Sequence, residues 1–261
     1  MRKFTTMLMF ICAAALAFVM PLRAAHAIHD LNVAHPSGAY SLLSNPASVI
    51  YTRHLSVQAA VGIAGKGGMT SQLLAYLEPD TGLGAGALYW HSMSGASGNR
   101  QEFGYILARQ VTPNVYYGLT IKQLNEGGVR VWAADIGLLF HDLSRLRIGL
   151  TAHNFVGQSA MNPLQVAGAV SYDVTPHLAV SLFASMPAAN GATDADVGVA
   201  VDVEPIPDVL ISLARIRSLR SSQEYWLGRL VYTVQSITFD ASVRVDGKND
   251  QRFTVGVLFR F

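Results

Sequence analysis

The sequence predicts an all-β fold, an up-and-down antiparallel β-barrel of about 14 strands that spans a membrane. Beyond His54, apolar residues alternate with small or polar residues, which is the period of a strand with two different faces. Hydrophobic residues make up 51% of the 261 residues and charged residues only 14%, below the ~25% of a typical soluble domain. After the N-terminal segment no run of ~18 apolar residues occurs, which excludes a bundle of membrane helices.

Residues 1–27 have the pattern of a secretory signal peptide. Arg2 and Lys3 form a positive start, an apolar run follows, and Ala25-His26-Ala27 provides a small-x-small cleavage site. Cleavage would lower the basic residues from 19 to 16 against 17 acidic residues, so the net charge becomes −1 instead of +2. This charge gives no reason to expect a nucleic-acid partner. The one cysteine, Cys12, lies in this segment, so neither a disulfide nor a thiolate metal site is expected in the mature chain.

Residues 28–54 form a short segment before the barrel, and residues 55–261 form the barrel itself. Turn signals divide the latter into predicted strands at 55–63, 69–77, 82–90, 101–110, 115–122, 129–140, 145–153, 164–173, 178–186, 196–203, 209–215, 224–232, 237–245 and 251–261. Each strand and its connection take ~15 residues, which matches a tilted membrane strand with a tight turn. Compact Pro- or Asp-bearing turns alternate with loops rich in Gly, Ser and Asn, such as 91–100. This alternation is expected when the two ends of a barrel face different compartments.

A sheet in lipid must close, because each unpaired backbone group in hydrocarbon costs several kcal/mol. The expected location is the bacterial outer membrane, among its lipids and lipopolysaccharide. Phe259 and Phe261, on the alternating last strand, resemble the C-terminal signal by which barrel assembly machinery recognises outer-membrane barrels. The alternative fold is a periplasmic β-sandwich or propeller. In such folds the second face carries charged side chains that contact water, whereas here this face is mostly Gly, Ala, Ser and Thr.

The alternation assigns one set of charged side chains to the lumen. These are Glu102, Lys122, Asp135, Arg147, His153, Asp173, Asp202, Asp240, Arg244 and Arg252. Both signs occur, so inward ion pairs are expected and strong selectivity for one sign is not. Gly84 and Gly86 are assigned to the same face, where they leave room in the bore, and Tyr89 is assigned to the outward face.

Two groups of motifs stand out. One is the segment Ser44-Asn45-Pro46-Ala47-Ser48, which precedes the first predicted strand. The other begins with Ala-Asp-Ile-Gly-Leu-Leu-Phe at 134–140 and continues with Arg-Ile-Gly-Leu-Thr-Ala-His-Asn-Phe at 147–155 and with Pro163. This combination resembles the FadL-type long-chain fatty-acid transporters and the related PorV-like and UPF0164-like outer-membrane proteins. The resemblance implies that Asn45, Pro46 and Ala47 belong to a hatch that folds into the barrel. The alternative is an ordinary turn that leads into the first strand.

Asp135 and Asn154 are expected to hydrogen-bond within the barrel or to close a loop, in preference to binding a ligand. His153 and Asn154 are neighbours in the sequence, so on a regular strand they face opposite sides. No Ser, His and orienting acid or amide can be placed together on one face, and the histidines of the N-terminal segment lack the spacing of metal ligands. The sequence therefore predicts no enzyme, no metal and no cofactor.

Two functions from different classes remain. The first is passive transport of small hydrophobic molecules through a partly plugged lumen. The second is an accessory or scaffold barrel of a secretion or envelope complex, as the PorV-like resemblance implies, and the short loops and crowded bore favour it. The partner is then a hydrophobic ligand or a secretion component. Arg215, Arg217 and Arg220 flank the loop before the twelfth strand, where they contact lipopolysaccharide if that loop is external or else form a solvated basic rim.

Overall fold

The structure of the protein is a computed structural model that describes residue 34 and residues 40–64, 70–95, 98–141, 145–157, 163–188, 195–219, 221–246 and 251–261. The predicted signal peptide at 1–27 and Arg220 lie outside the described residues. Within the described ranges, no helix has the length and hydropathy needed to cross a membrane.

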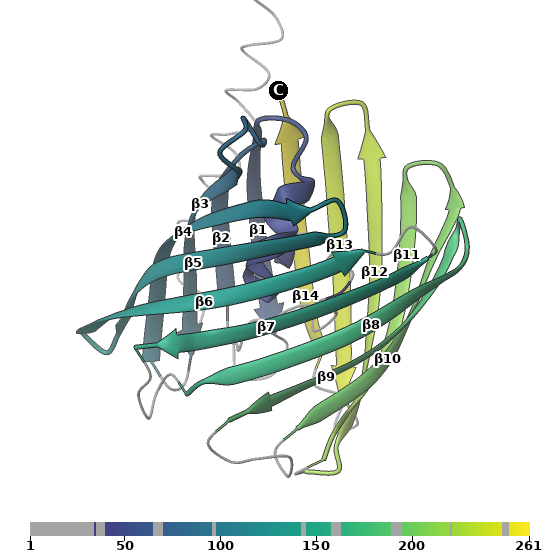
Figure 1. The fold of residues 1–261 in the computed structure, drawn as a ribbon. Coiled ribbons are helices and arrows are strands. Elements are labelled where there is room, and N and C mark those ends of the chain that lie inside the picture. Colours follow the sequence, from purple (N-terminus) through teal and green to yellow (C-terminus); the bar gives the residue numbers. More distant parts are fainter. Residues whose placement is uncertain are drawn as a thin grey trace, which may run out of the picture.

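Two short helical elements precede an all-antiparallel barrel (Figure 1). The helical elements are α2 (Ser41–Ser44) and the 3-10 helix η1 (Pro46–Tyr51). The strands are β1 (Ser56–Ala64), β2 (Thr70–Glu78), β3 (Ala85–Gly95), β4 (Gly98–Thr112), β5 (Val115–Glu126), β6 (Val129–His141), β7 (Leu146–Val156), β8 (Gln165–Thr175), β9 (Leu178–Pro187), β10 (Asp196–Ile206), β11 (Val209–Ser218), β12 (Glu224–Val234), β13 (Ile237–Asp246) and β14 (Gln251–Arg260). The predicted fold class, an up-and-down β-barrel of 14 strands, is confirmed.

Pairing between the first and last strands closes the barrel. Each strand pairs with its chain neighbours, and β1 pairs antiparallel with β14 from Ser56↔Arg260 to Ala64↔Arg252. Closure leaves no sheet edge, which is the condition for a sheet in hydrocarbon. We call the end of the barrel where β1 starts and β14 stops the turn end, because the tight turns at 113–114, 176–177, 207–208 and 235–236 also lie there. The opposite end is the loop end.

The two faces of the wall differ as the alternation predicts. Large apolar side chains cover the outside, where Leu74, Phe103, Trp132, Leu182 and Val255 each expose between 47% and 64% of their surface. Small or polar side chains cover the inside, where Ala60, Ser71, Thr120, Ser181 and Thr254 are buried. An apolar exterior of this kind is suited to lipid.

The predicted assignment of faces is wrong on β3. Tyr89 points inward and is buried, whereas Leu88 is exposed on the outside. Gly86 shares the outer face with Leu88, because a Cβ on Gly86 would meet the hydroxyl of Tyr105, which is itself exposed. The run Gly82-Leu83-Gly84-Ala85-Gly86 has too little contrast between apolar and polar residues to reveal which face is which. The strand starts only at Ala85, after Gly84 turns the chain at a φ of +126°.

The predicted loop at 91–100 is also mostly strand. β3 continues to Gly95 and β4 starts at Gly98, with Ser94 paired to Asn99. Gly, Ser and Asn have low intrinsic strand propensity, but here the adjacent strands supply the backbone partners. His91, at the start of this stretch, is consequently buried on the inner wall.

Candidate functional site

Residues 40–54, which precede β1, lie inside the barrel (Figure 1). We call residues 40–54 the inner segment; it comprises α2, η1 and the residues that lead to β1. In Figure 1 its helices lie within the ring of strands, and η1 contacts β3, β4, β5 and β6. Leu42, Asn45, Ala47 and Val49 are all buried against this part of the wall. The inner segment therefore lies along the β3–β6 side of the lumen, and Ala34, which precedes it in the chain, is buried against the wall of β8–β12.

Asn45 fixes the start of η1 and ties it to the wall. Its Oδ1 accepts a hydrogen bond of 3.0 Å from the backbone N–H of Ala47, which makes it an N-cap, and Pro46 follows as the first helical residue. Its Nδ2 donates to the carbonyl oxygen of Leu138 on β6 at 3.2 Å. The Asn45 side chain therefore both caps η1 and attaches it to β6.

Two glycines make room for this motif. Gly118 on β5 and Gly137 on β6 pair directly across the two strands. A Cβ on Gly118 would overlap the backbone of Pro46 and Ala47, and a Cβ on Gly137 would overlap the side chains of Asn45 and Pro46. The wall and the inner segment can approach this closely only because both positions lack a side chain.

Replacement Asn45→Ala is expected to loosen the inner segment while the barrel stays folded. The variant loses the cap and leaves the Leu138 carbonyl without this donor, which together should cost about 1–3 kcal/mol of docking free energy. Limited proteolysis of the folded protein should cut the variant within the inner segment faster than the wild type. Equal cutting rates would contradict the docking role. Thr52→Ala, outside the buried part of the segment, is the control.

Apolar contacts hold the other part of the inner segment. Tyr40, Leu42 and Val49 join a buried cluster with Leu73, Ile106 and other residues of β1–β4. The Tyr40 hydroxyl pairs with Ser71 Oγ at 2.9 Å, and its ring meets His91 edge-on at 5.7 Å. Burial raises the pKa of Tyr40 to about 12, so its hydroxyl keeps its proton.

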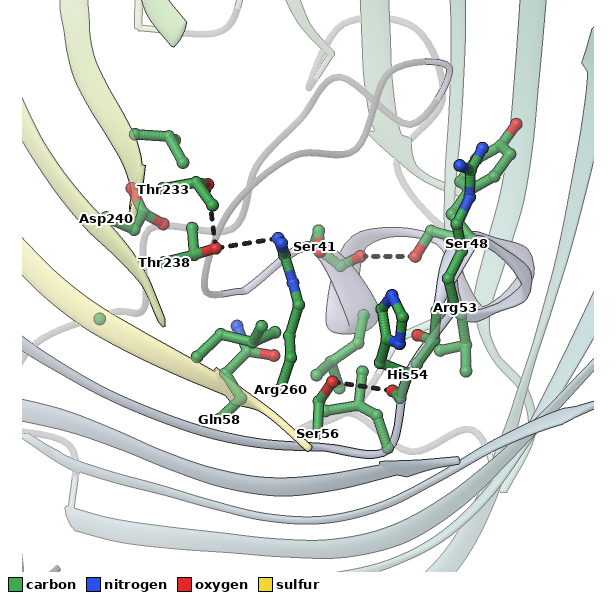
Figure 2. A pocket seen from close by; sticks show the side chains of 18 of the residues that line it. Ser41, Ser48, Arg53, His54, Ser56, Gln58, Thr233, Thr238, Asp240 and Arg260 are labelled. Atoms are coloured by element: carbon green, nitrogen blue, oxygen red, sulfur yellow. Dashed lines mark hydrogen bonds between the residues drawn. The ribbon is translucent and has the colours of Figure 1, made fainter. Parts of the chain in front are cut away.

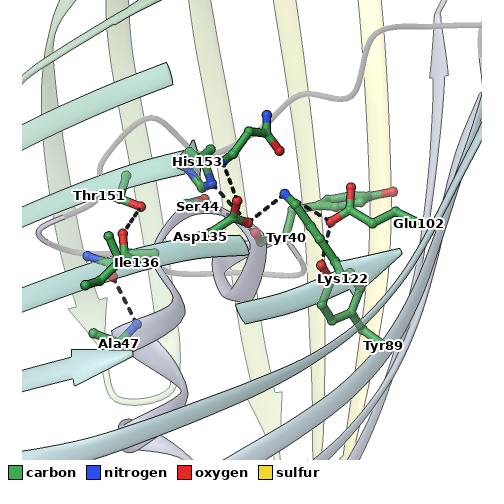
Figure 3. A network of polar contacts seen from close by, with 12 residues as sticks. Tyr40, Ser44, Ala47, Tyr89, Glu102, Lys122, Asp135, Ile136, Thr151 and His153 are labelled. Atoms are coloured by element: carbon green, nitrogen blue, oxygen red, sulfur yellow. Dashed lines mark hydrogen bonds and ion pairs between the residues drawn. The ribbon is translucent and has the colours of Figure 1, made fainter. Parts of the chain in front are cut away.

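A buried network of charged side chains lies on the inner wall of β4–β7 (Figure 3). Lys122 Nζ lies 2.6 Å from Asp135 Oδ2 and 3.5 Å from Glu102 Oε1, and both carboxylates have further partners. Glu102 also faces Arg100 at 3.8 Å and accepts from the Tyr89 hydroxyl. Every charge in this network has an opposite charge beside it, as buried charges require.

A bulge in β7 completes the surroundings of Asp135. Ala134 pairs with Val156 but Ile136 pairs with Ala152, so extra β7 residues stand opposite Asp135. His153 Nδ1 lies 3.4 Å from Asp135 Oδ2, and the backbone N–H of Asn154 donates to Asp135 Oδ1 at 2.7 Å. A regular strand would place the His153 and Asn154 side chains on opposite sides; at this bulge, with Asn154 at a φ of +56°, the His153 side chain and the Asn154 backbone N–H both reach Asp135. The Asn154 side chain donates to the carbonyl of Pro163, which ties the strand to the following loop.

The remaining lumen candidates lie in other parts of the wall. Arg147 donates to Asp173 across β7 and β8. Arg229 donates to both carboxylate oxygens of Asp240, at 3.0 and 3.3 Å. Arg244 stacks over the Tyr225 ring at 3.5 Å, with Arg252 opposite it on β14, and Asp202 is buried on β10. The structure therefore distributes the predicted set over several local pairs, and only Glu102, Lys122, Asp135 and His153 form one cluster.

Sequence reasoning missed several members of these groups. The alternation places Tyr89 on the outside, and it gives no role to Arg100 or Arg229. The alternation of Tyr225, Leu227 and Arg229 could have placed Arg229 inward beside Asp240.

A cavity of about 540 Å³ remains at the turn end, between the inner segment and the wall of β12–β14 (Figure 2). Arg53 and His54 line it from the approach to β1, Arg260 from the end of β14, and Thr238 and Asp240 from β13. Ser41 and Ser48 border it on the inner segment, where Ser48 Oγ donates to the Ser41 carbonyl at 3.4 Å. Across the described part of the chain, no group of three or more His, Cys, Asp or Glu is placed to hold a metal ion.

Comparisons with solved structures find the same fold in outer-membrane proteins. The Ralstonia pickettii toluene transporter TbuX matches with a TM-score of 0.67 and 11% identity over 88% of this chain and 95% of that chain. The CymD monoaromatic hydrocarbon channel matches with a TM-score of 0.63 and 10% identity over 88% and 94%. The Acinetobacter baumannii outer membrane protein Omp33 matches with a TM-score of 0.54 and 14% identity over 80% and 98%.

These likenesses establish the fold, a closed β-barrel as in outer-membrane proteins. No protein-family model matches the sequence, and no curated protein matches it. Membership of the FadL-like or PorV-like family stays a prediction, because identities of 10–14% do not extend beyond the fold.

Proposed function

We propose that the protein is an outer-membrane barrel through which small hydrophobic molecules pass passively, with the inner segment as a partial plug. The observation that carries this proposal is the position of the inner segment. It fills the side of the lumen next to β3–β6 and leaves a cavity next to β12–β14. In this proposal the turn end faces the periplasm, Asn45, Pro46 and Ala47 anchor the plug, and no chemical reaction takes place.

The composition of the inner wall of β8–β12 supports the proposal that the solute is apolar. Ala169, Phe183, Ile216 and Tyr225 form a buried apolar cluster there, which also includes Ala34 from the chain before the inner segment and has Leu227 packed against it. An aliphatic and aromatic lining offers apolar solutes contacts that a water-filled pore lacks. TbuX and CymD, whose names describe a toluene transporter and a monoaromatic hydrocarbon channel, have the same barrel fold and support this solute class.

Uptake by whole cells tests the proposal, because lipopolysaccharide slows apolar molecules that pure phospholipid bilayers admit. Cells that produce the protein should take up radiolabelled toluene faster than cells that carry an empty vector. A neutral sugar of similar size serves as the matched solute. The protein should increase the uptake of this sugar much less than that of toluene, since the plug leaves no wide aqueous pore. Equal toluene uptake with and without the protein would reject the proposal.

A second candidate is an accessory barrel of a secretion or envelope complex. The crowded lumen favours it, because the inner segment and the Lys122 network together occupy the β4–β7 side. Cross-linking in intact membranes followed by purification should then recover one stoichiometric envelope protein, while toluene uptake stays at the control rate.

Contacts with the assembly machinery and with lipopolysaccharide remain proposals. The Phe261 backbone N–H donates to the Leu55 carbonyl at 2.8 Å and its side chain is exposed, as a recognition signal requires. Arg215 and Arg217 face outward at the loop end, and Arg215 pairs with Glu224 at 2.7 Å. Both arginines would meet lipid phosphates if the loop end is external.

A further inference from the structure

We propose that the cavity at the turn end is a binding site for a small amphipathic organic anion, a carboxylate on a compact apolar body. Its volume of about 540 Å³ falls within the ~300–1,000 Å³ of small-molecule sites. The inference extends the proposed function, because the cavity lies where a solute leaves the lumen. Binding itself does not require that transport occurs.

Two guanidinium groups, those of Arg53 and Arg260, supply the charged hydrogen-bond donors of the cavity. Arg260 extends from the end of β14 toward the inner segment, and its Nη2 donates to Thr238 Oγ1 at 2.9 Å (Figure 2). Thr238 in turn pairs with Thr233 at 3.0 Å, so the guanidinium is held at the cavity wall. A guanidinium has several N–H donors in one plane, a geometry that matches a carboxylate, and the Thr238 oxygen takes one of them.

The charge of the cavity is positive. Arg53 and Arg260 line it, and His54 adds an imidazole that can donate in its neutral form. Asp240 is the one acidic residue among the described lining residues. Its charge is balanced by Arg229, which donates to both of its oxygens. The two lining arginines therefore remain to attract an anion.

Apolar side chains form a second part of the lining, beside polar residues such as Ser56 and Gln58. Leu42 and Val49 contribute from the inner segment, Leu77 from β2, and Val231 and Leu258 from the opposite wall. A ligand that satisfies both parts carries its charge near Arg260 and an apolar body against these side chains. Since the lining comes from both the inner segment and the wall, a bound anion would also hold the two together.

Calorimetric titration of the full-length protein in detergent micelles tests the site with benzoate as the probe. We expect benzoate to bind, and benzamide, its neutral counterpart, to bind at least tenfold more weakly. Arg260→Gln should weaken benzoate binding roughly tenfold or more, because it removes the charged donor. Arg217→Gln, an outward arginine at the loop end, is the matched control and should leave binding unchanged. Each titration is corrected by one into micelles alone.

Three results would overturn the proposal: equal affinities for benzoate and benzamide, full affinity in Arg260→Gln, or binding of inorganic phosphate as tight as that of benzoate. The last would indicate a site for the charge alone. If Arg260→Gln fails to fold, Arg53→Gln, which lies before β1 and outside the sheet, provides the same comparison. Toluene uptake and benzoate binding are separate measurements, so failure of this site can be told apart from failure of the transport proposal.

Discussion

Replacement of Gly137 by alanine is expected to open the barrel to water. The new methyl group would occupy the space of the Asn45 and Pro46 side chains, and the rigid wall of β6 cannot retreat from them. The inner segment must then leave its place, while the strands keep their pairing. Proteoliposomes that contain Gly137→Ala should swell several-fold faster in a small sugar than wild-type proteoliposomes. Gly118→Ala should have the same effect, because the new methyl group would overlap the backbone of Pro46 and Ala47.

Gly228→Ala is the matched control for this experiment. Gly228 also lies in a strand, but a Cβ there would lie 3.6 Å from Val243, an ordinary van der Waals contact. This variant should swell at the wild-type rate. If Gly137→Ala folds into a barrel and remains as closed as the wild type, the inner segment is not the plug.

Replacement of Lys122 by methionine is expected to destabilise the barrel more than any other single change to its charged residues. The substitution leaves Glu102 and Asp135 buried near each other without their shared cation. Loss of one partner from a buried ion pair costs about 3–5 kcal/mol, because the remaining charge is neither hydrated nor balanced. Urea unfolding from lipid vesicles, followed by tryptophan fluorescence, should show this loss in the free energy of unfolding.

Two further variants separate charge from packing. The triple change Lys122→Met, Glu102→Gln and Asp135→Asn removes the carboxylate charges as well and should recover most of the stability. Glu204→Gln affects an exposed carboxylate 4.0 Å from His177 and should change stability by no more than about 0.5 kcal/mol. Wild-type stability in Lys122→Met would mean that the network does not contribute to folding.

The alternation along the chain was enough to predict most of the wall. The stretches that contain Trp132 and Phe253 have a strong contrast between apolar and small residues, and both side chains face outward. The run around Gly84 lacks this contrast, so the face of Tyr89 depended on where β3 starts. The stretch after His91 looked like a loop because its strand character comes from backbone pairing with β4 and not from its own residues.

The sequence by itself therefore predicted about 14 antiparallel strands and their closure, because a sheet in lipid requires an apolar exterior at every second residue and permits no free edge. Only the tertiary structure decided which inward residues meet. Lys122 joins Glu102 and Asp135 because β4, β5 and β6 lie side by side in one register, and Asn45 reaches Leu138 because two glycines face each other there. Such contacts depend on register, bulges and the approach of the inner segment, which involve residues that are far apart in the chain and leave no local pattern in it.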